Sequence, residues 1–142
     1  MKTFLAALLF ANTVLLTHHP VSFKGRIELV AEKPLRALSS GADIEIGLPL
    51  ASTSGKGRGL LAEWNAIKTS FPAGTIVGYL VDEDGKTITL TYRGHSSISN
   101  NDVRLLLDNK SGIPTDKLFS KIIIESEMQL NDINIYWRDY KK

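Results

Sequence analysis

Residues 75–93 read TIVGYLVDEDGKTITLTYR, and this stretch decides the fold class. The first arm, residues 75–81, is apolar and rich in β-branched side chains, and in the second arm Ile88 and Leu90 alternate with threonines. Asp84-Gly85 lies between the arms, and such a dipeptide between two alternating runs is the strongest short-range signal of a β-hairpin. The stretch therefore predicts a pair of antiparallel strands.

Period-two alternation also predicts strands over residues 21–32, 44–48 and 133–138, and short apolar runs predict strands over residues 103–107 and 119–126. We expect Pro34 and Pro49 to end the first two, because proline donates no ladder hydrogen bond. We expect Asn131-Asp132 to form a turn that separates the last two strands. A short helix capped at Asn100 or Asn101 is the alternative for residues 103–107.

Only residues 60–71 have helical spacing, since Leu60, Trp64, Ile67 and Phe71 recur along one face and Pro72 follows. Many short strands without regular helical crossovers predict a mainly β domain, an antiparallel β-sandwich or open barrel with this one short helix. An α+β fold is the alternative. The predicted core consists of the inward positions of the clearest strands: Ile88, Leu90, Ile122, Ile124, Ile133, Ile135 and Trp137.

Residues 1–17 have the pattern of a secretory signal peptide. Lys2 is followed by a run of mostly apolar residues that is too short to span a bilayer comfortably, and Pro20 disfavours a longer helix. Cleavage is expected after Thr17 or after Thr13, with an uncleaved membrane anchor as the alternative. Residues 18–142 then form a single β-rich domain outside the cytoplasm, periplasmic or secreted, in a bacterium.

The composition excludes several classes of protein. The chain has 142 residues, with 17 Lys and Arg against 15 Asp and Glu, and a net charge of +2 is too small for a nucleic-acid-binding surface. It contains no cysteine, which excludes disulfides, thiolate metal sites and a cysteine nucleophile.

The loop Ser52–Gly59 is rich in glycine and carries Lys56 and Arg58, but it lacks the Gly-Lys-Ser/Thr ending of a phosphate-binding loop. We predict that it contacts a partner together with Arg93 and His95 from the second polar stretch, residues 93–101. A passive flexible connector is the alternative for this loop.

The histidines indicate one candidate metal site. If cleavage follows Thr17, the new amino group and the ring of His18 form a copper chelate that His95 completes in a square-planar nitrogen set. The alternative is that both histidines lie in exposed segments.

The aromatic residues near the C-terminus suggest a second binding surface. Tyr136 and Tyr140 lie on the opposite parity from the inward Trp137, so they are the better candidates for contacts with a partner. No Gly-x-Ser-x-Gly nucleophile elbow occurs. Glu125 and Glu127 have the spacing of one solvated sheet face rather than of an acid/base pair.

These observations favour a small exported protein without catalytic activity or cofactor, which binds another protein or an envelope component. A membrane-tethered immunity or exclusion factor and a periplasmic copper- or small-ligand-binding protein are the alternatives. A weak hydrolase is the least favoured class.

Overall fold

The computed structural model describes residues 12–49, 75–95 and 102–139, and strands make up 74% of them. The strands are β1 (Asn12–Leu15), β2 (Val21–Arg36), β3 (Asp43–Pro49), β4 (Ile76–Asp82), β5 (Thr87–His95), β6 (Asp102–Asp108) and β7 (Leu118–Asp139). This part of the chain contains no helix, and so none that is long and apolar enough to cross a membrane. The predicted helix over residues 60–71 lies outside the described residues.

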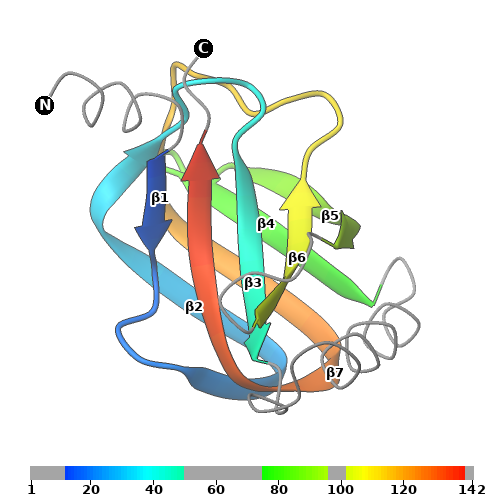
Figure 1. Ribbon diagram of the computed structural model, residues 1–142. Helices are drawn as coiled ribbons and strands as arrows, with labels where there is room; N and C mark the ends of the chain where they lie inside the picture. Colours follow the sequence, from blue (N-terminus) through cyan, green and yellow to red (C-terminus); the bar gives the residue numbers. More distant parts are fainter. Residues whose placement is uncertain (1–11, 50–74, 96–101, 140–142) are drawn as a thin grey trace, which may run out of the picture.

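Five antiparallel strands, β7, β3, β6, β5 and β4, close a barrel, and β1 and β2 lie outside it along β7 (Figure 1). Closure depends on β7, whose first half pairs with β4 and whose second half pairs with β3. The predicted mainly β, antiparallel fold is confirmed. The strands close completely, however, so the expectation of an open barrel is wrong and a sandwich is not seen.

Two predicted strand ends are wrong. Pro34 lies inside β2, in the register shift between Val30 and Leu35, where no ladder hydrogen bond is required of it. Asn131 and Asp132 lie inside β7, because Asp132 adopts a φ of 52° and bends the strand instead of ending it. The Asp132 N–H donates to the Ser22 hydroxyl at 3.0 Å, which supports the bend.

The predicted hairpin over residues 75–93 is confirmed as β4 and β5. Gly85 has a φ of 81°, a conformation that glycine adopts without a steric cost. One carboxylate oxygen of Asp82 accepts the N–H groups of Asp84 and Lys86, each at 2.9 Å, and this pins the loop. Residues 102–108 form a strand and not the alternative helix.

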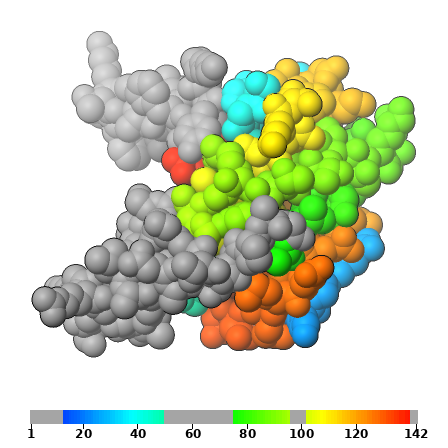
Figure 2. Space-filling view, turned by 90° about the vertical axis from the view of Figure 1, so that its right-hand side faces the viewer, coloured from blue at the N-terminus to red at the C-terminus, as the bar shows by residue number. Residues whose placement is uncertain are grey.

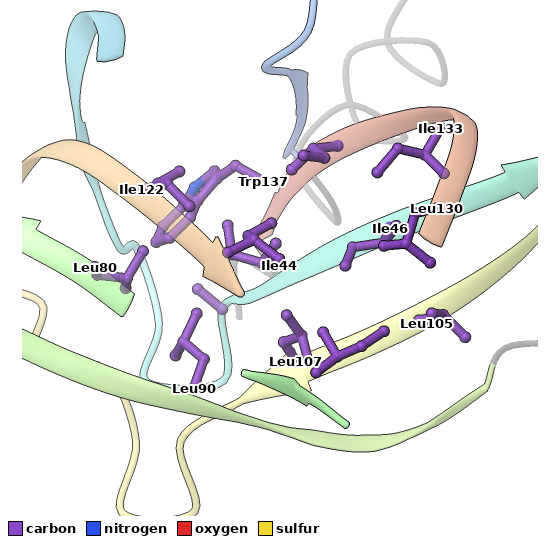
Figure 3. Close-up of a cluster of buried hydrophobic side chains, with 14 of the residues drawn as sticks. Ile44, Ile46, Leu80, Leu90, Leu105, Leu107, Ile122, Leu130, Ile133 and Trp137 are labelled. Atoms are coloured by element: carbon purple, nitrogen blue, oxygen red, sulfur yellow. The ribbon is translucent and has the colours of Figure 1, made fainter. Parts of the chain in front are cut away.

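Alternate residues of the barrel strands point inward and fill the interior, as Figure 3 shows. Six of the seven predicted core residues are buried, and Ile88 is only partly buried. The interior is thus packed mainly with Ile and Leu side chains, together with Phe119, Val103 and Trp137. Figure 2 shows the outer surfaces of β5 and β6 next to one another on one side of the molecule.

Candidate functional site

Strand β3 is buried on both faces. Ile44 and Ile46 point into the barrel core, whereas Asp43 and Glu45 point outward, yet their side chains are only 2% and 0% exposed. Burying a carboxylate costs several kcal/mol, on the order of the net stability of a small domain, unless it is paired and hydrogen-bonded. The outer face of β3 therefore requires cationic partners.

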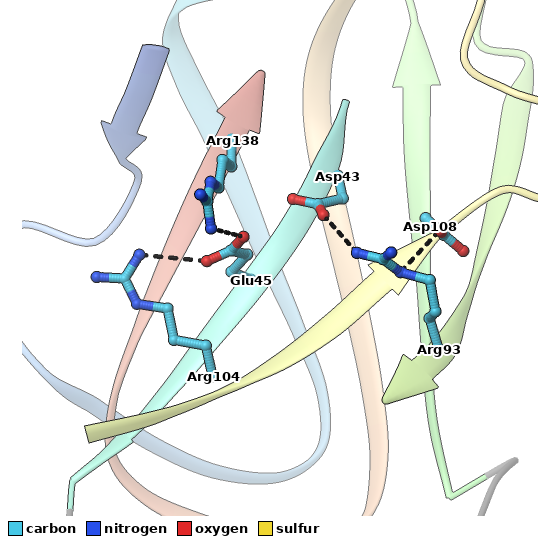
Figure 4. Close-up of polar contacts among 6 residues, drawn as sticks. All are labelled: Asp43, Glu45, Arg93, Arg104, Asp108 and Arg138. Atoms are coloured by element: carbon cyan, nitrogen blue, oxygen red, sulfur yellow. Dashed lines mark hydrogen bonds and ion pairs between the residues drawn. The ribbon is translucent and has the colours of Figure 1, made fainter. Parts of the chain in front are cut away.

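Two arginines pair with Glu45, one from each neighbouring strand. Arg104 of β6 donates from Nη1 to Oε1 at 3.2 Å, and Arg138 of β7 donates from Nη1 to Oε2 at 3.1 Å. Figure 4 shows the carboxylate between the two guanidinium groups. Each oxygen of the buried carboxylate thus has its own charge-assisted hydrogen bond.

Asp43 has a weaker set of partners. Its Oδ2 accepts from Arg93 of β5 at 3.2 Å, and the same arginine contacts Asp108 of β6 through Nε at 3.0 Å (Figure 4). Among the described residues, no donor lies within hydrogen-bond distance of Asp43 Oδ1, which is also buried. Burial raises the pKa of Asp43 to about 7, the Glu45 carboxylate acts in the same direction, and Arg93 and Arg138 oppose this only in part.

Arg104 is also fixed by an aromatic ring. Its guanidinium lies 4.0 Å from the ring centre of Tyr136, which is a cation–π contact. Gly47 leaves room for this arrangement, since a Cβ there would lie 3.2 Å from Tyr136 Cε2 and 3.1 Å from Asp102 Oδ2. Burial raises the pKa of Asp102, whose other oxygen lies 3.9 Å from Arg104 Nε.

We call Arg93, Arg104, Arg138 and Tyr136 the arginine face. Two of its members, Arg93 and Tyr136, were predicted as partner-binding residues from the sequence, and the structure brings both into one network. Arg104, Arg138 and the buried carboxylates were missed, because Asp43-Ile44-Glu45-Ile46 has the alternation of an ordinary half-exposed strand.

The other predicted site residues do not join this network. Lys56, Arg58 and Tyr140 lie outside the described residues. His95 is the last residue of β5, with its Nε2 at 2.9 Å from the Tyr92 hydroxyl. His18 follows β1, and its Nε2 lies 2.8 Å from Glu32 Oε1 in an exposed pair.

The proposed copper site has no further support from the described ranges. The two histidines have different neighbours, and no group of three or more His, Cys, Asp or Glu side chains suited to a metal ion occurs within residues 12–49, 75–95 and 102–139.

A second surface feature is an apolar groove of about 300 Å³ between β1 and the end of β2, with Ile122 among its lining residues. Val14, Leu15 and Val30 line it and are exposed. His18 and Glu32 also line it, so their ion pair belongs to the groove. Most side chains that line this groove are apolar, whereas the arginine face consists mainly of charged side chains.

Comparisons with protein-family models, with curated proteins and with solved structures give no significant match. The chemistry of the described surfaces is therefore the basis for assigning a function.

Proposed function

We propose that this protein is a small exported binding protein without catalytic activity, and that it binds a protein partner or envelope component through the arginine face. The observation that supports this most is the fixed position of Arg104 and Arg138 by the buried Glu45 carboxylate, with Tyr136 against Arg104 and the half-exposed Arg93 on the same face. Arginine and tyrosine are the residue types that contribute most to binding energy at protein interfaces.

The buried carboxylates reduce the cost of binding. A free arginine loses side-chain entropy when a partner immobilises it, about 0.5–1.5 kcal/mol for a flexible side chain. Arg104 and Arg138 are already held by Glu45 and are still 19% and 33% exposed, and Arg93 is 52% exposed. The face is thus pre-organised and accessible at the same time.

The same ion pairs disfavour a catalytic role for Glu45 and Asp108. A catalytic carboxylate has to exchange a proton or a bond with substrate. Here both oxygens of Glu45 are taken by arginines, and Asp108 is engaged by Arg93. These carboxylates position cations, which is a structural role in a binding surface.

We also propose that residues 1–17 direct export, as the sequence predicts. Residues 12–15 pair with β7, and the Thr17 side chain is buried against Asn134 and Ile135. Cleavage after Thr17 would remove all of these contacts. The pairing supports cleavage after Thr13 or retention of the whole segment as a tether.

Arg93→Gln tests the binding face, with Arg26→Gln as the matched control. Arg26 is 54% exposed and forms one ion pair with Glu28, so the two arginines have similar exposure on different surfaces. We expect Arg93→Gln to lower crosslinked capture from the cell envelope about tenfold, equal to about 1.4 kcal/mol, and most strongly at low salt.

Circular dichroism would establish that both variants are folded. Equal capture by the two variants across a salt series would rule out the arginine face as the binding site.

A further inference from the structure

Asp43 and Glu45 are two buried carboxylates on the same side of one strand, two positions apart. Charged groups from every neighbouring barrel strand face them: Arg93 from β5, Arg104, Asp102 and Asp108 from β6, and Arg138 from β7. When all these groups are ionised, the four carboxylates exceed the three guanidinium groups by one negative charge. One proton taken up by the cluster would balance it.

The geometry places that proton on Asp43. Glu45 has an arginine on each oxygen, whereas Asp43 shares a single arginine with Asp108 and has a buried oxygen, Oδ1, with no donor among the described residues. A proton on Asp43 forms a hydrogen bond with Glu45, and this bond is one of the causes that raise the Asp43 pKa.

We propose that the Asp43–Glu45 pair takes up one exchangeable proton, and that this proton releases Arg93 from the barrel wall to an acidic group of the partner. The release of Arg93 to a partner rests on the function proposed above, whereas the proton uptake does not.

The release follows from the two ion pairs of Arg93. While Asp43 is ionised, it attracts the Arg93 Nη2 at 3.2 Å and holds the guanidinium against β3. A neutral Asp43 no longer attracts this group, and Arg93 keeps only its Nε contact with Asp108. Half of the arginine side chain is already exposed, so its Nη groups are then available for a carboxylate from outside.

The sign of the stability effect follows from linkage. The pKa of Asp43 is raised from 3.8 to about 7 in the folded state, so between these values the folded chain binds more protons than the unfolded chain. Stability therefore falls as the pH rises through this window, by up to about tenfold in the folding equilibrium for each pH unit, and levels off above pH 7.

The first experiment measures the proton itself. Infrared difference spectra and urea unfolding are recorded from about pH 8 to about pH 5 for the wild type, Asp43→Asn and the control Glu28→Gln, which removes an exposed carboxylate outside the cluster. We expect a protonated-carboxyl band and the predicted pH slope in the wild type and in Glu28→Gln, and the loss of both in Asp43→Asn. An unchanged band or slope in Asp43→Asn would overturn the proposal.

Arg93→Gln gives a second variant for the same titration. It removes a cation that opposes protonation, so the midpoint of the carboxyl band should move to higher pH. A midpoint that stayed in place would show that Arg93 does not sense this proton, and would overturn the proposed coupling.

The second experiment measures the release of Arg93 with a fluorescent hexaglutamate peptide at low salt, since its carboxylates stay ionised throughout this pH range. We expect several-fold tighter binding at about pH 6 than at about pH 8 in the wild type, and a clearly smaller pH dependence in Asp43→Asn.

If the infrared band is present but peptide binding does not depend on pH, the release of Arg93 is refuted. Loss of envelope capture by Arg93→Gln tests the binding function separately, so the two failures are distinguishable.

Discussion

Glu45 is the residue on which the arginine face depends most. Its carboxylate is fully buried, and each of its oxygens accepts a hydrogen bond from a different strand, β6 on one side and β7 on the other. The side chain thereby joins three strands across the outer wall of the barrel. Its removal leaves two partly buried guanidinium groups without their main counter-charge.

We expect Glu45→Ala to lower the free energy of unfolding by about 3–5 kcal/mol, the usual cost of breaking a buried ion pair. Glu28→Ala is the matched control, because Glu28 pairs with Arg26 at 2.8 Å on an exposed surface, where loss of one ion pair has a far smaller effect on stability. Urea denaturation of both variants measures the difference. Similar losses for the two variants would contradict a special role for Glu45.

At the scale of elements, β7 organises the fold. It is 22 residues long and pairs with β1, β2, β3 and β4. The run of isoleucines at 122–124 predicts its first half and period-two alternation its second half, with Ile122 and Ile135 both inward. Alternation cannot predict that they form one strand, since Asn131-Asp132 is also the composition of a turn.

The prediction that Pro34 ends its strand is wrong for a related reason. A proline is incompatible with a central strand but not with the irregular end of an outer strand, and position in the sheet is not a local property of the sequence. The same holds for the site. Asp43 and Glu45 meet Arg93 and Arg138 from positions 50 and 93 residues away, respectively. Of the two predicted members, Tyr136 follows from strand parity, whereas Arg93 was predicted from its charge in a polar stretch and lies in β5.

Thr17, which follows the end of β1, provides a prediction at the scale of elements. Thr17 Oγ1 accepts the Ile135 N–H at 3.3 Å and donates to Asn134 Oδ1 at 3.1 Å. We expect Thr17→Val to lower stability by about 1–3 kcal/mol, because a buried N–H group loses its acceptor. Thermal unfolding would measure the loss, with the exposed Thr13→Val as control. No difference between the variants would show that Thr17 is not part of the folded domain.

At the scale of the whole molecule, we expect the N-terminal segment to serve both in export and in the folded sheet. Its apolar first half is expected to engage the export machinery, whereas residues 12–17 belong to the folded sheet. A cleavage site that spares the sheet has to lie near Thr13, and a tether spares it entirely.

Replacing Leu8 and Leu9 with Asp should keep the protein in the cytoplasm, because charge in the apolar run prevents its recognition for export. Leu38→Asp places a carboxylate of the same kind at an exposed site, 51% accessible, and should leave export intact. Cell fractionation measures both.

The intact mass of the exported wild type should correspond to a chain that retains Val14 to Thr17. Export of the Leu8/Leu9 variant, or a mature chain that begins at His18, would contradict this.

The dependence on β7 also determines when the protein can fold. Because the last strand to be synthesised supplies the partner of four earlier ones, a growing chain that lacks residues 118–139 cannot close its sheet on the ribosome. The pairing of β7 with strands that lie far earlier in the sequence is a non-local step, and such topologies fold in milliseconds to seconds rather than microseconds. For the export proposed above this delay is an advantage, since translocation machinery that threads unfolded polypeptide can bind the N-terminal segment before the barrel exists.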